Sequence, residues 1–135
     1  MVSSDAFEAE MAAVRAALRR ELEAFGYRVA TDTRSLRGEL YVKGDRDLAA
    51  ALFEFKASAE EAFESMYQGR WMEGMPPRFA VLPSSEAGNP VLEMLAQARL
   101  HVLFYETAGD DTNGLDAVGF PDLSSAVTVI GPPRS

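Results

Sequence analysis

The chain of 135 residues contains no cysteine and only one histidine. Without cysteine it has neither a disulfide framework nor a thiolate metal site, so a cytoplasmic location is the default expectation. It also has no apolar run close to the roughly 20 residues that a membrane-spanning helix needs. The first residues lack the basic and then apolar pattern of a signal peptide, and we therefore expect no membrane partner.

The chain also has fewer basic than acidic residues. The 13 Lys and Arg residues stand against 21 Asp and Glu residues, which gives a formal net charge of −8. This balance argues against tight nonspecific binding to nucleic acid through phosphate contacts. It does not exclude a local basic patch, because the field depends on where the charges lie. The hydrophobic content of 47% is ordinary for a globular protein, and the length fits one domain with its own core.

The periodicity of apolar residues predicts a succession of helices and strands. Apolar side chains at steps of three and four are typical of helices, and β-rich stretches between turn residues are typical of strands. The predicted helices cover residues 5–25, 58–72 and 91–98. The predicted strands cover residues 27–31, 38–43, 48–57, 78–82 and 100–106.

In chain order these elements give αβββαβαβ, which predicts an α/β protein with a mixed sheet and flanking helices. The turn residues at 44–47 predict that the second and third strands form a hairpin. The alternation of strands and helices after it predicts parallel crossovers. We expect residues 1–106 to form a single domain and residues 107–135 to form a C-terminal loop and tail, in which residues 126–130 can add one extra strand.

The third predicted strand carries two charges in an apolar setting. Because strand residues alternate between faces, Glu54 and Lys56 should point one way and Phe53 and Phe55 the other. Charges on a mostly buried strand are costly unless they pair or bind something. One interpretation is a salt bridge at a strand end. The other is a site for metal-assisted phosphodiester hydrolysis, with the carboxylate on a divalent cation and the lysine beside the attacking water.

This pattern resembles the PD-(D/E)xK nuclease superfamily, which includes restriction endonucleases and Holliday-junction resolvases. The resemblance rests on Gly38-Glu-Leu-Tyr41, on Leu52-Phe-Glu-Phe-Lys56 and on the element order over residues 5–106. It implies a restriction-endonuclease-like core and a Mg²⁺- or Mn²⁺-dependent endonuclease acting on DNA. Glu54 would bind the metal, Lys56 would assist the nucleophile, and Gln68 on the next helix would support the catalytic site.

A second metal ligand comes from the hairpin register. With a tight turn between the second and third strands, Glu39 lies on the same face as Glu54 and close to directly opposite it. The predicted metal ligands are therefore Glu54 and Glu39.

Two positions depart from the family pattern. Tyr41 stands at the position of the family's aspartate, and tyrosine is a poor ligand for a hard cation at neutral pH. Arg15 stands in the region of the first helix that often carries a glutamate, and Glu10 and Glu21 are weaker candidates for that role. These departures support an alternative, in which the chain is a catalytically inactive member of the same fold and acts as an oligomeric scaffold, such as a homodimer, or as a regulatory binding domain. An unrelated acidic chaperone-like domain with a similar element order is a third interpretation.

Overall fold

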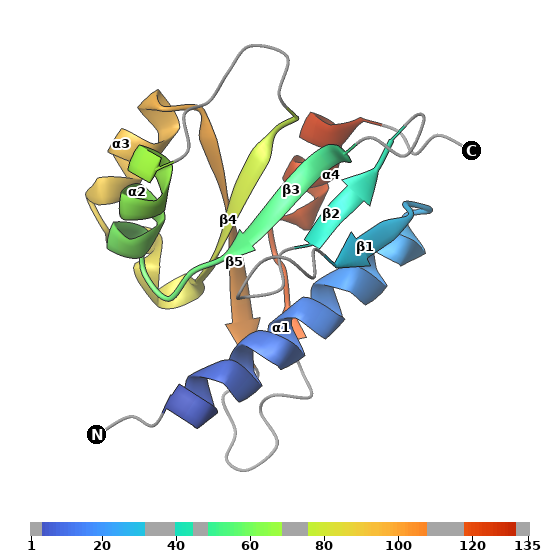
Figure 1. The fold of residues 1–135 in the computed structure, drawn as a ribbon, viewed down its shortest axis with the longest axis horizontal. Coiled ribbons are helices and arrows are strands. Elements are labelled where there is room, and N and C mark those ends of the chain that lie inside the picture. Colours follow the sequence, from blue (N-terminus) through green and yellow to red (C-terminus); the bar gives the residue numbers. More distant parts are fainter. Residues whose placement is uncertain (1–3, 32–39, 45–48, 69–75, 108–117, 132–135) are drawn as a thin grey trace.

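The computed structural model describes residues 4–31, 40–44, 49–68, 76–107 and 118–131, with the backbone alone for residues 4–8, 49 and 65–68. Within these ranges the chain forms helices and strands, which Figure 1 shows. The helices are α1 (Ser4–Ala24), α2 (Ala59–Gln68), the 3-10 helix η2 (Ser84–Gly88), α3 (Val91–Gln97) and α4 (Leu123–Ile130). The strands are β1 (Val29–Thr31), β2 (Leu40–Lys43), β3 (Ala49–Phe55), β4 (Arg78–Pro83), β5 (Leu100–Thr107) and β6 (Val118–Gly119).

The strands form one mixed sheet in the order β1-β2-β3-β4-β5-β6. The pairs β1–β2, β2–β3 and β5–β6 are antiparallel, whereas β3–β4 and β4–β5 are parallel. The predicted α/β class with a mixed sheet is therefore confirmed, together with the element order as far as β5. The predicted hairpin of β2 and β3 and the parallel crossovers that follow it are confirmed as well.

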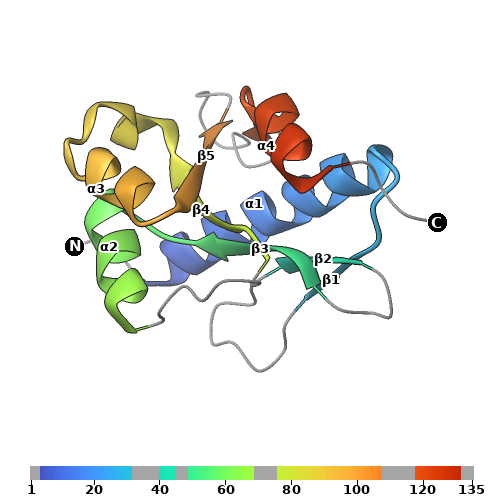
Figure 2. The same ribbon diagram turned by 90° about the horizontal axis from the view of Figure 1, so that it is seen from above.

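Each face of the sheet is covered by its own pair of helices (Figure 2). Helices α1 and α4 cover one face, where the larger apolar cluster includes Leu18, Phe53, Phe79 and Leu123. Helices α2 and α3 cover the other face, where a smaller cluster includes Ala62, Leu82 and Leu95. Among the described residues, no helix has the length and apolar character needed to cross a membrane.

Helix α1 packs through the apolar stripe that its sequence predicts. The side chains of Met11, Val14, Leu18 and Leu22 recur at steps of three and four and are buried against the sheet. Phe25, which we also expect on this stripe, is 45% exposed. The helix ends at Ala24, one residue earlier, so Phe25 no longer follows the helical repeat.

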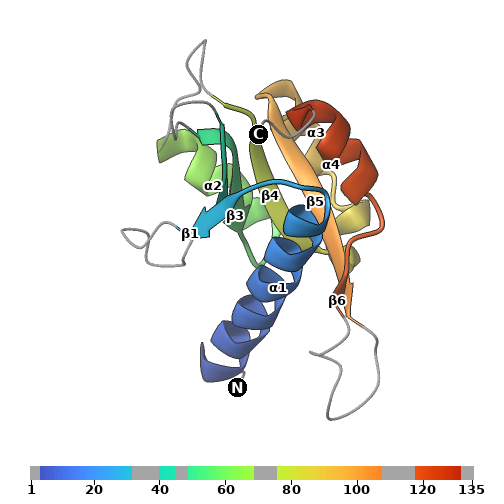
Figure 3. The ribbon, with the colours of Figure 1, turned by 90° about the vertical axis from the view of Figure 1, so that its right-hand side faces the viewer.

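The expectation of a strand over residues 126–130 is wrong, because this segment is the second half of helix α4. Leu123 and Ala126 are buried in the larger cluster, and Val127 and Ile130 pack against it. This spacing of three and four is helical, and it outweighs the β-propensity of the valine and isoleucine residues. Figure 3 shows α4 on the same side of the sheet as α1. The Tyr27 hydroxyl donates a hydrogen bond to the Gly131 carbonyl just after this helix.

Tyr105 connects β5 to α1, because its hydroxyl donates a hydrogen bond of 2.9 Å to the Glu10 carboxylate. Burial raises the pKa of Tyr105 above its ordinary value of 10.0, and the hydrogen bond and charge of Glu10 raise it further. The folded chain thus favours the neutral phenol. Its contribution to stability is full below about pH 10 and is lost as the pH rises from there toward the raised pKa.

We therefore expect the free energy of unfolding to fall more steeply above about pH 10 in the wild type than in Tyr105→Phe, because the variant has no phenol to ionise at this position. Urea unfolding curves across the alkaline range measure both slopes. The slopes are compared, rather than the absolute stabilities, because the variant also loses the hydrogen bond to Glu10. Equal slopes would show that Tyr105 does not contribute in this way.

Candidate functional site

Strand β3 presents different side chains to the two faces of the sheet, as its sequence predicts. Phe53 and Phe55 are fully buried in the cluster beneath α1. Glu54 lies between them in the strand and therefore points to the face that α2 and α3 cover. Its residue exposure is only 7%, so this carboxylate is removed from bulk water and requires a partner.

The partner of Glu54 is Arg78, the first residue of β4. The Arg78 Nε donates a hydrogen bond of 2.8 Å to Oε2 of Glu54, and Nη2 of the same guanidinium lies 2.7 Å from that oxygen. Both nitrogens therefore contact one carboxylate oxygen. Arg78 is also well covered, with 12% of its side chain exposed. A charged hydrogen bond in such a setting is considerably stronger than one at the surface.

Lys56 contacts the other oxygen of the same carboxylate. Its Nζ lies 4.0 Å from Oε1 of Glu54, and its side chain is 13% exposed. We call Glu54, Lys56 and Arg78 the Glu54 cluster. It contains one carboxylate and two cations, so it carries a local positive charge within a chain whose net charge is −8. The arrangement is that of a covered ion pair, one of the two interpretations that the sequence left open.

The register of two parallel strands creates this cluster. Glu54 lies opposite Ala80, and Leu52 lies opposite Arg78, so the carboxylate and the guanidinium are diagonal neighbours on one face of the sheet. The Leu52 amide donates to the Pro77 carbonyl at 3.0 Å, which continues the pairing up to the residue before Arg78. The register of the two strands therefore brings the two side chains together.

Sequence reasoning missed Arg78. Arg78 is the first residue of a predicted strand that is otherwise apolar, directly after Pro76 and Pro77. A single charge at such a position could have indicated a partner for the buried Glu54 carboxylate. However, a helix and a connection separate β3 from β4, and the register between parallel strands cannot be read from so distant a pair.

The other residues that the sequence singled out are described only in part. Glu39 is outside the described residues. Gln68 is the last residue of α2, and its side chain also lies outside the described part of the chain. Tyr41, which stands where the PD-(D/E)xK pattern has an aspartate, is half-buried in β2 opposite Leu52.

The residues of α1 that the family pattern singles out belong to the opposite face of the sheet from Glu54. The guanidinium of Arg15 lies 5.5 Å from the centre of the Phe55 ring. Glu10 accepts the hydrogen bond from Tyr105. Because Phe55 points away from Glu54, neither residue of α1 joins the Glu54 cluster through these contacts. His101 is stacked on Phe79, with 5.1 Å between ring centres.

A metal would need several oxygen or nitrogen ligands near Glu54. Across the described residues, no three His, Asp or Glu side chains form a group that could hold a metal ion. Glu54 is the described member of the predicted ligand pair, and its two oxygens face Arg78 and Lys56. The pair of Glu54 with Glu39 stays a prediction, because Glu39 is outside the described ranges.

No protein-family model matches the chain, and neither a curated protein nor a solved structure matches it. The resemblance to PD-(D/E)xK nucleases thus rests on the short motif and on the order of the elements, and membership of that superfamily remains a prediction.

Proposed function

We propose that this chain is a catalytically inactive relative of the metal-dependent nucleases and acts as an oligomeric scaffold or binding domain. The observation that carries the proposal is the contact of the Arg78 guanidinium with Oε2 of Glu54, through Nε at 2.8 Å and Nη2 at 2.7 Å. The residue that would bind the catalytic metal is already neutralised by a cation of the chain itself.

The chemistry of Mg²⁺ supports this proposal. Mg²⁺ requires nearly octahedral oxygen ligands at about 2.0–2.1 Å, and it gives up its water reluctantly. A cation at Glu54 would have to displace Arg78 from Oε2 while Lys56 remains near Oε1. Displacement would leave a guanidinium with 12% of its side chain exposed without its carboxylate, which is unfavourable. Tyr41 supplies no carboxylate in compensation.

A nuclease acting on DNA with Mg²⁺ or Mn²⁺ is the second candidate function. It is favoured by one observation, the placement of Glu54 and Lys56 on the same face of β3 directly before α2. In this function Lys56 would orient the attacking water and Glu54 and Glu39 would hold the metal.

A cleavage assay separates the two candidates. We expect no cleavage of linear, branched or single-stranded DNA by the wild type with either Mg²⁺ or Mn²⁺. The two informative variants are Lys56→Ala and, as a matched control, Lys43→Ala, because Lys43 lies in β2 and has no part in the Glu54 cluster. Metal-dependent cleavage that Lys56→Ala abolishes and Lys43→Ala retains would overturn the proposal in favour of the nuclease.

A further inference from the structure

Within the described part of the chain, strand β5 has a long open edge. One side of β5 pairs with β4 from Leu100 to Tyr105. On the other side, the short strand β6 pairs only with Glu106 and Thr107. Within the described ranges, residues 100–105 have no strand on this second side. An open edge presents backbone donors and acceptors that another strand can use.

The hydrogen bonds of the sheet show which residues face this edge. The amides of Leu52 and Lys56 donate to the carbonyls of Pro77 and Val81, so odd-numbered residues of β4 direct their backbone groups to β3. The backbone groups of even-numbered residues of β4 then face β5. In the parallel register they form hydrogen bonds with the backbone groups of odd-numbered residues of β5. Backbone groups of Leu100, Val102 and Phe104 consequently point to the open edge.

The side chains at this edge are apolar. The stretch Leu100-His-Val-Leu-Phe104 contains no Lys, Glu, Asp, Arg or Pro, the residues with which proteins commonly protect an edge from pairing. Beside it lies a hollow of about 400 Å³, formed by Leu92 and Ala96 of α3 together with Arg99, Val102 and Phe104. Val102 and Phe104 are only partly buried against the smaller cluster, so a strand added here would cover them.

We propose that the open edge of β5 binds the β5 of a second copy of this chain, in antiparallel register about a two-fold axis at Val102. This inference deepens the proposed scaffold function by naming its partner. In this register Val102 lies opposite Val102 of the second copy, and Leu100 lies opposite Phe104. All three residues direct their backbone groups to the edge, so they form hydrogen-bonded pairs. Glu106 keeps its pairing with β6.

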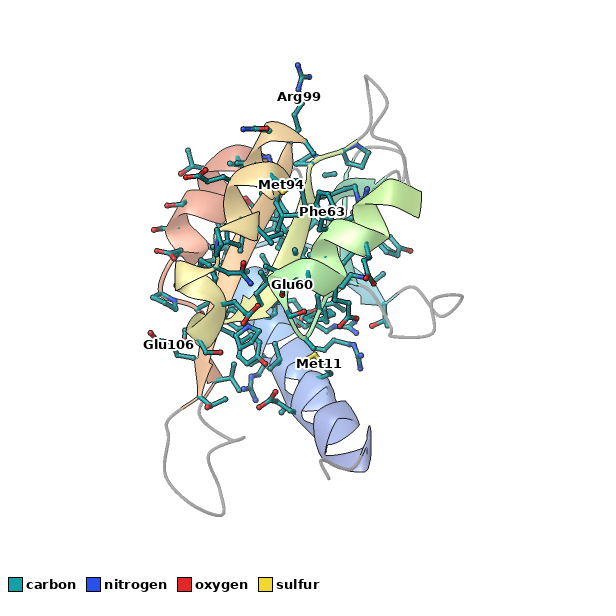
Figure 4. All side chains as sticks on the ribbon, turned by 90° about the vertical axis from the view of Figure 1, so that its left-hand side faces the viewer. Met11, Glu60, Phe63, Met94, Arg99 and Glu106 are labelled. Atoms are coloured by element: carbon teal, nitrogen blue, oxygen red, sulfur yellow. The ribbon has the colours of Figure 1, made fainter. Side chains whose placement is uncertain are left out.

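Charges at the two ends of β5 favour the second copy over an unrelated strand. Arg99 precedes the strand and Glu106 lies near its other end, and both are exposed (Figure 4). Arg99 lines the hollow beside α3, and Glu106 has the same strand parity as the three edge residues, so both lie on the α3 face. In this antiparallel register each Arg99 lies opposite Tyr105 of the second copy, one residue from Glu106, so the opposite charges come close at two symmetric places.

The mass of the protein in solution tests the inference. Sedimentation velocity of the full chain in the micromolar range should give twice the 14.7 kDa of one chain. Hydrogen exchange should slow with rising protein concentration at the amides of Val102 and Phe104. A strict monomer of 14.7 kDa, with exchange that does not depend on concentration, would overturn the inference.

A charge swap tests the register without disturbing the core. Arg99→Glu and Glu106→Arg should each weaken the dimer by at least about fivefold, because each creates two like-charge contacts. The double variant should restore wild-type affinity. The matched controls are Arg20→Glu and Glu21→Arg, which make the same changes of charge at exposed positions of α1 on the other face and should leave the affinity unchanged. A dimer insensitive to both single swaps would overturn the register.

These results are independent of the cleavage assay. A dimer that cleaves DNA would refute the proposed function while retaining the β5 interface. A monomer that does not cleave DNA would refute the interface while leaving the absence of catalysis intact.

Discussion

Arg78→Ala is expected to lower the free energy of unfolding by about 3–5 kcal/mol, the cost of removing one partner from a covered ion pair. The substitution leaves the Glu54 carboxylate, in a residue only 7% exposed, without its guanidinium. Because Lys56 remains 4.0 Å from Oε1, we expect a value near the lower end of that range. Urea unfolding followed by circular dichroism measures the loss.

A double variant distinguishes loss of the ion pair from loss of packing. Glu54→Met combined with Arg78→Met replaces both charges by apolar side chains of similar length, and buried ion pairs replaced in this way often cost little. We expect the double variant to be clearly more stable than Arg78→Ala. If Arg78→Ala changed stability by less than about 1 kcal/mol, the contact with Glu54 would not stabilise the fold.

Phe53→Ala is expected to lower the free energy of unfolding by about 3–5 kcal/mol, because it opens a cavity in the main core. Phe53 is fully buried, and its ring is stacked on Phe79 with 4.8 Å between ring centres. It also lies next to Glu54 in β3, so the same strand supports both the core and the Glu54 cluster. Thermal or urea unfolding measures the effect.

The chain supplies a matched control for this substitution. Phe25 is 45% exposed just beyond the end of α1, and Phe25→Ala should change stability by no more than about 0.5 kcal/mol. Comparable losses for the two variants would contradict the assignment of Phe53 to the core.

The sequence predicted the features that depend on local periodicity. The alternation of Phe53, Glu54 and Phe55 correctly indicated that the two phenylalanines and the glutamate point to opposite faces of the sheet. The apolar stripe of α1 from Met11 to Leu22 was predicted equally well, because apolar residues at steps of three or four lie on one face of a helix.

Features set by contacts between distant residues could not be predicted in this way. Arg78 reaches Glu54 only because β3 and β4 pair in a particular register across an intervening helix. The helix α4 was mistaken for a strand, since its valine and isoleucine favour strands while its packing onto the larger cluster decides the outcome. Of the two predicted metal ligands, Glu54 lies on the face of β3 that the alternation predicted, whereas Glu39 is outside the described residues.

Titration of Mn²⁺ into the wild type by calorimetry tests the central claim most directly, namely that Glu54 is held by Arg78 instead of a metal. We predict no saturable heat at neutral pH, the same result as for Glu54→Gln. Stoichiometric binding of Mn²⁺ by the wild type that Glu54→Gln abolishes would show that a cation displaces Arg78, and it would contradict the account.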